Sequence, residues 1–112
     1  MDMIEIIRGD TCPFSFKRKD KNGDVITEPA EKLYFTVKLN HRSDEFVIQK
    51  TIDDMTFEDS VYRFVLEPED TDGLDYGVYV FDLEVITQEY KQTIARGSIK
   101  ISEEVTFKSN EV

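Results

Sequence analysis

The residue types that carry most protein catalysis are scarce in this sequence of 112 residues, which has one histidine, His41, and one cysteine, Cys12. A nucleophilic triad needs a serine or cysteine that is activated by a histidine, which an acid in turn orients. His41 instead stands in a polar bend, which is typical of an exposed turn residue. Zinc would lack ligands, because these two side chains are the only conventional soft ones. We therefore predict no catalytic residue, no metal centre, no cofactor and no enzymatic activity.

Carboxylates offer a better chemical hypothesis. Asp70, Asp72 and Asp75 fall in one acidic connection, and calcium takes about six to eight oxygen ligands, often from such loops. The spacing matches no calcium-loop motif. The stretch from Asp70 to Gly73 lacks the third acid of an EF-hand loop, and no glutamate stands at the position that closes such a loop. These three residues are our calcium candidates. The alternative is a solvated acidic rim that keeps the protein soluble.

Two other motifs favour structural interpretations. The tripeptide Arg8-Gly9-Asp10 has the sequence that integrins recognise, but it ends a predicted strand, where Gly9 supplies a turn or bulge. Cys12 alternates with Phe14 and Phe16, which predicts a buried and unreactive thiol. A single cysteine also excludes an internal disulfide.

Net charge is −10, and its distribution is uneven. Residues 53–89 hold twelve acids and one base, whereas acids and bases nearly balance in 1–52 and 90–112. An acidic surface of this kind argues against nucleic-acid binding and against docking to an anionic membrane. The start of the sequence lacks the layout of a signal peptide, and no apolar run is long enough for a membrane span. We therefore expect synthesis in a cytoplasm.

The elements that must position these residues are strands, because apolar and polar residues alternate along most of the sequence and no window has a convincing helical stripe. About seven short strands separated by turns predict an all-β, immunoglobulin-like antiparallel β-sandwich, with a barrel as the alternative. We place this domain at 1–102 and a flexible C-terminal tail at 103–112. In the last strand the apolar positions change from even to odd after Ile94, which predicts a β-bulge at Gly97.

The stretch from Asp75 to Phe81 indicates how the two sheets are joined. Immunoglobulin-type domains have a similar pattern, in which a tyrosine hydroxyl bonds back to the backbone a few residues upstream and closes the corner between the sheets. Asp75, Gly77 and Tyr79 fit that pattern, and Phe81 stands where the disulfide cysteine would be. We predict a structural corner here.

Apolar residues also occur opposite the main core series. If they face outward, they form a surface suited to docking a partner; if the sheets curl strongly, they cover edges instead. The predicted partner face comprises Tyr34, Val47, Val78, Val80 and Ile86. Val61 and Val65 likewise alternate with the core residues of their own strand.

Several stretches also share a likeness to one family of phage proteins. They are Arg8-Gly9-Asp10-Thr11, Phe14-Ser15-Phe16, 19–26, Phe35-Thr36-Val37-Lys38, Pro68-Glu69-Asp70-Thr71, 77–85 and 97–101. Together they resemble the N-terminal Ig-like domain of upper-baseplate proteins in siphophages and prophages of Gram-positive bacteria. The resemblance implies a non-enzymatic part of the virion tail that is assembled through protein contacts and has no catalytic residues. Baseplate proteins continue beyond this domain, so the chain would be either a free-standing tail protein or a fragment.

These observations predict a structural or assembly module of a bacteriophage or prophage tail, made in the host cytoplasm and carried in the virion. Its expected partners are other tail or baseplate proteins and, by self-association, further copies of itself. The alternative function is a calcium- or carbohydrate-binding adhesion module. Sugar binding would have to use exposed tyrosines, because the sequence has no tryptophan.

Overall fold

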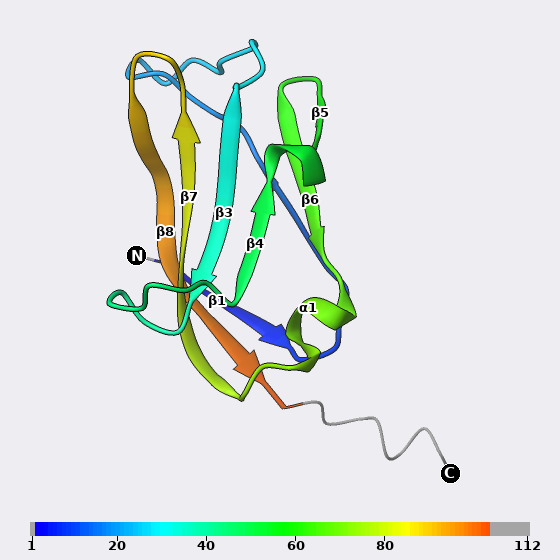
Figure 1. Cartoon of the computed structure of the whole chain (residues 1–112). Coiled ribbons are helices and arrows are strands. Elements are labelled where there is room, and N and C mark those ends of the chain that lie inside the picture. The colour runs from blue at the N-terminus through cyan, green and yellow to red at the C-terminus, as the bar shows by residue number, and fades with distance from the viewer. Residues whose placement is uncertain (1, 104–112) are drawn as a thin grey trace.

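The computed structural model describes residues 2–103 and confirms the all-β sandwich (Figure 1). Of the predicted tail at 103–112, all but Glu103 lies outside the described residues. The elements in chain order are β1 (Asp2–Ile7), β2 (Cys12–Phe16), β3 (Lys32–Lys38), β4 (Ile48–Thr51), η1 (Ile52–Asp54), β5 (Thr56–Glu58), β6 (Val61–Leu66), α1 (Pro68–Asp72), β7 (Gly77–Ile86) and β8 (Lys91–Ser102).

The described strands form two separate sheets, which makes the fold a sandwich and not a closed barrel. The larger sheet has the order β1-β8-β7-β3-β4, and the smaller sheet has the order β2-β6-β5. Every pair is antiparallel except β1 and β8, which run parallel with Ile4 beside Ile99. Figure 1 shows α1 at one end of the sandwich, close to the β1–β2 turn.

The core lies between the sheets and follows the predicted alternation. In β3 the side chains of Leu33, Phe35 and Val37 are buried, and the residues between them are more exposed. The ring of Phe35 lies 4.8 Å from that of Phe64 in the opposite sheet, centroid to centroid. The aromatic residues of β2 and β6 therefore pack directly against the larger sheet.

Three local features differ from the sequence prediction. Apolar and polar residues alternate from Phe46 to Ile52, which predicts a strand over this range, but the strand is limited to β4 and Phe46 is 53% exposed. The described chain has eight strands instead of about seven, because β5 forms a short hairpin with β6. The connection after β6 contains the helix α1, whose N-terminus has the favourable residues Pro68 at its first position and Asp70 two residues later.

The β-bulge of β8 exists, but the predicted position at Gly97 is wrong. Leu83 pairs with Ala95 and Glu84 pairs with Thr93, which leaves Ile94 as the extra residue. Gly97 stays in register opposite Phe81. The parity change therefore occurs at Ile94, which keeps its side chain against the core.

Candidate functional site

The corner between the sheets is held by Tyr79. Its hydroxyl donates a 2.8 Å hydrogen bond to the carbonyl oxygen of Asp75, four residues upstream, as the tyrosine-corner pattern predicts. Gly77 lies between them with φ of 146°, a conformation that side chains disfavour. Burial, and then the Asp75 carboxylate, raise the pKa of the Tyr79 phenol. The hydroxyl therefore stays protonated and able to donate.

Phe81 and Cys12 both lie on the interior side of the sandwich. The Phe81 ring is 5.7 Å from that of Phe35, centroid to centroid, so it fills the position by packing. The half-buried Cys12 packs against the core beside Leu66. Burial, and then the carboxylate of Asp10, raise the pKa of the Cys12 thiol. A raised pKa disfavours the reactive thiolate, so Cys12 is poorly suited to nucleophilic chemistry.

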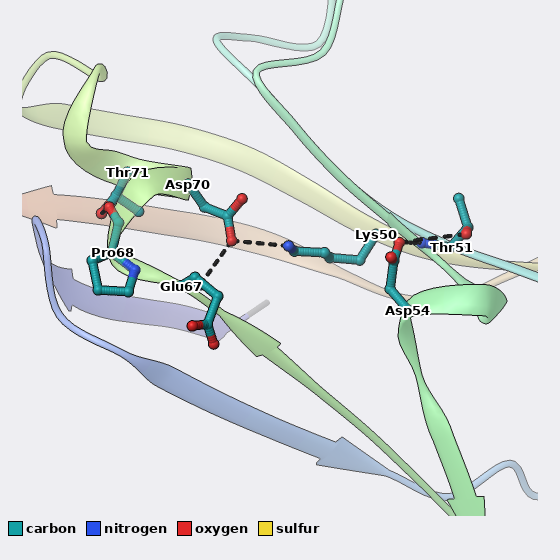
Figure 2. Close-up of polar contacts among 7 residues, drawn as sticks. All are labelled: Lys50, Thr51, Asp54, Glu67, Pro68, Asp70 and Thr71. Atoms are coloured by element: carbon teal, nitrogen blue, oxygen red, sulfur yellow. Dashed lines mark hydrogen bonds and ion pairs between the residues drawn. The ribbon is translucent and has the colours of Figure 1, made fainter.

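The three calcium candidates are not brought together. Asp70 is part of α1, where its carboxylate accepts a 2.7 Å hydrogen bond from the backbone N–H of Glu67 and pairs with Lys50 (Figure 2). The side chains of Asp72 and Asp75 are exposed. Among residues 2–103, no group of three or more acids, histidines or cysteines is arranged to hold a metal ion.

The Arg8-Gly9-Asp10 stretch is a tight turn between β1 and β2. Gly9 has φ of 87°, and the N–H of Asp10 bonds to the carbonyl of Ile7. Arg8 donates to the carbonyl of Leu74 at 3.2 Å and lies over the ring of Tyr76. The arginine is therefore engaged by its own chain and does not protrude as an adhesion loop requires.

Four of the five residues of the predicted partner face lie on one side of the molecule. Tyr34, Val78, Val80 and Ile86 occupy the outer face of the large sheet, because they alternate with the buried residues of β3 and β7. Val47 lies outside the ladder, because its N–H bonds at 2.8 Å to the carbonyl of Val37, which is already paired with Ile48, so the register does not assign it to this face. Val61 and Val65 are on β6 and so belong to the other sheet.

The face is not one continuous apolar patch, because a polar row crosses it. Thr36 is paired with Asp82, and Asp82 is paired with Arg96 across the next strand. The amide of Gln49 extends the row by donating to the Thr36 hydroxyl at 3.2 Å. Val78 and Val80 lie on one side of this row, and Tyr34 and Ile86 lie on the other.

A hollow of about 470 Å³ opens on this row beside the bulge of β8. Its lining includes the bases Lys38 and Arg96, the acid Asp82, the exposed His41 and the apolar Val80. The sequence did not indicate this hollow, because it depends on pairing between three strands and on the position of the bulge. Hydrogen-bonding groups and apolar side chains therefore lie together on the outer face, as they do in many protein interfaces.

Exposed tyrosines do not form a platform for a sugar ring. Tyr76 is 47% exposed and Tyr90 is 45% exposed. Tyr76 directly precedes β7, whereas Tyr90 lies in the turn that follows it, so the ten residues of the strand separate them. The stacking of one sugar on both rings is therefore impossible in this arrangement.

Comparisons with known proteins support the fold and nothing finer. No family model and no curated protein matches the sequence. A solved structure titled as an endo-beta-1,4-mannanase from Thermotoga petrophila superposes with a TM-score of 0.61 at 18% identity. The match covers 93% of this chain but only 18% of the mannanase chain. At this identity the likeness shows a shared β-sandwich.

In residues 2–103, neither helix has the length and apolarity needed to cross a bilayer.

Proposed function

We propose that this chain is a non-enzymatic assembly module that docks a partner protein on the outer face of its large sheet. The observation that carries the proposal is that four apolar residues, Tyr34, Val78, Val80 and Ile86, share the outer face with a polar hollow. Val78 is 51% exposed, so a partner on this face would remove apolar surface from water. The polar row would fix the partner's orientation through hydrogen bonds.

We further propose that the partners are other tail or baseplate proteins of a phage or prophage. This step rests on the resemblance of the sequence to the Ig-like domain of upper-baseplate proteins. A chain with a net charge of −10 suits contacts among proteins better than contacts with nucleic acid. The protein would then be part of the virion tail after synthesis in the host cytoplasm.

The test is a binding measurement with a matched pair of variants. Val78→Asp places a charge on the outer face, and Val25→Asp places one on an exposed valine of the loop between β2 and β3. Immobilised wild type and Val25→Asp should retain a tail protein from a preparation of the encoding phage, and Val78→Asp should lose it. Equal retention by both variants would exclude this face as the docking site.

The alternative adhesion function is tested by thermal melting with calcium and by titration with soluble mannan or cellulose fragments. We expect calcium to leave the midpoint unchanged, because the candidate acids are not grouped. A ligand that binds only the folded state raises the midpoint by mass action. A rise with either ligand would favour the adhesion function over assembly.

A further inference from the structure

The edges of the two sheets are protected to different degrees. An exposed edge strand presents unpaired backbone groups to other chains, and proteins block such edges with prolines, charges, bulges or short strands. β2 carries Pro13, β5 has only three residues, and β4 has four residues with Lys50 in register with the buried Phe35. The part of β8 that extends beyond β1, Lys91–Arg96, has a bulge and a base at each end.

β1 lacks most of these protective features, and its only charged residues are the acids Asp2 and Glu5. Its six residues, Asp-Met-Ile-Glu-Ile-Ile, include no proline, no base and no bulge, and Met3 is 61% exposed. It is the last strand of the large sheet, and no other strand within residues 2–103 pairs with its open side.

The open side of β1 presents specific backbone groups. The N–H of Arg8 bonds to the carbonyl of Ser102 at 3.0 Å. This bond shows which residues of β1 direct their backbone groups toward β8. Because backbone groups alternate in direction along a strand, Ile4 and Ile6 bond toward β8. The N–H and C=O groups of Met3 and Glu5 point away from it.

We propose that β1 pairs with β1 of a second copy of this chain, antiparallel and across a two-fold axis, so that two large sheets join into one. This self-pairing uses a different surface from the proposed docking face and does not depend on it. Isologous two-fold contacts of this kind are the commonest form of protein self-association.

The register explains why a second copy fits. For the buried faces of the two sheets to be continuous, Ile4 must lie opposite an even-numbered residue of the partner's β1. Ile4 of the second copy satisfies this condition. The seam then continues the apolar row from Ile99 through Ile4 to the partner's Ile4. Asp2 falls opposite the partner's Ile6 at each end of the seam.

Charge selects the same register. With Ile4 at the centre, Glu5 lies opposite the partner's Met3, and each Glu5 stays beside Lys100 and accepts a hydrogen bond from Ser102 in its own chain. A register centred on Glu5 would oppose two like charges, which destabilises a strand pair. The seam centred on Ile4 has no like charges opposite each other.

The same features predict a weak dimer. One strand pair buries less than the ~1,200–2,000 Å² of a standard stable interface. Each copy also carries a net charge of −10, which opposes association at low ionic strength. Dimerisation should therefore require high protein concentration and should strengthen as salt screens the repulsion.

Sedimentation of the full chain from micromolar to near-millimolar concentration, at low and high salt, tests the proposal. Met3→Pro removes an outward N–H and leaves the ladder to β8 intact, whereas Met3→Ala shortens the side chain and keeps the N–H. Wild type and Met3→Ala should dimerise, more tightly at high salt, and Met3→Pro should stay monomeric with an unchanged circular dichroism spectrum. A wild type that is monomeric throughout, or a Met3→Pro variant that dimerises like wild type, would overturn the proposal.

Amide hydrogen exchange of the wild type gives a second test that needs no substitution at the edge. Protection of the Met3 and Glu5 amides should rise with protein concentration, and protection of Ile4 and Ile6 should not. Concentration-independent exchange at Met3 and Glu5 would contradict the self-pairing.

Val78→Asp should retain the dimer even if it abolishes docking, so the failure of one proposal is distinguishable from the failure of the other.

Discussion

Lys50 Nζ lies 2.9 Å from Asp70 Oδ2, and this ion pair joins an edge strand of the large sheet to the helix that follows β6 of the small sheet (Figure 2). The same carboxylate accepts the backbone N–H of Glu67 at the start of α1. Both charged side chains are mostly shielded, with exposed fractions of 17% and 22%. One carboxylate therefore connects the two layers and caps the helix.

This double role predicts unequal costs for removing the two partners. Lys50→Met loses only the ion pair and should lower the free energy of unfolding by about 1 kcal/mol. Asp70→Ala also loses the cap and should cost about 2 kcal/mol. Urea unfolding measures both, with the exposed Glu69→Ala as the control. Equal costs for the two variants would show that the cap contributes nothing.

Removal of the corner hydroxyl should destabilise the fold. Tyr79→Phe keeps the ring but loses the bond to Asp75, and we expect a cost of about 1 kcal/mol. Tyr76→Phe, three residues earlier and 47% exposed, is the matched control and should be neutral. If the two variants have the same unfolding midpoint, Tyr79 acts by packing alone.

Two glycines near the corner should respond to alanine with opposite signs. Gly77 has φ of 146°, so Gly77→Ala introduces backbone strain of about 1–3 kcal/mol although its site has open space. Gly73 has φ of −87° and equal space, so Gly73→Ala should be neutral or stabilise by about 0.4–1 kcal/mol through the unfolded state. Thermal unfolding of both variants is the measurement. A tolerated Gly77→Ala would mean that this backbone can relax.

Stability should fall at alkaline pH. The folded protein raises the pKa of the Cys12 thiol above its ordinary value of 9.0 and that of the Tyr79 phenol above 10.0. The unfolded chain therefore loses these protons at a lower pH than the folded protein does. The stability contributed by the two protonated groups is complete below pH 9.0 and is lost as pH rises through their folded-state pKa values. The double variant Cys12→Ala, Tyr79→Phe should show a shallower decline of unfolding free energy with pH. A slope identical to that of wild type would assign the loss to other groups.

The sequence was sufficient to predict most of the strands, because alternation reports which face is buried. Leu33, Phe35 and Val37 illustrate this, since each is buried as expected. It could not place the bulge at Ile94, because parity shows that an extra residue is present but not which residue is extra. The helix α1 was also missed, since five residues are too few for a helical period. Its signal was the proline after Glu67, followed by acids.

The candidate site was predictable only in part. Parity correctly grouped Val78, Val80 and Tyr34 on a single face, because neighbours on β3 and β7 follow the sheet register. It wrongly implied one apolar patch, since the row through Asp82 depends on which residues of three strands lie opposite one another. The pair formed by Lys50 and Asp70 was likewise invisible, because it joins segments that only the packed sheets bring together.

The parallel pairing of β1 with β8 also bears on how this protein is made. Ile4 lies beside Ile99, so nearly the whole described chain must be synthesised before the first strand finds its neighbour. Contacts between such distant residues carry a large loop-closure cost and slow the folding of β-sandwiches. On the ribosome, β1 must therefore wait with its apolar side chains exposed while β2 to β7 emerge. Folding can be completed only when residues 97–102 have left the exit tunnel.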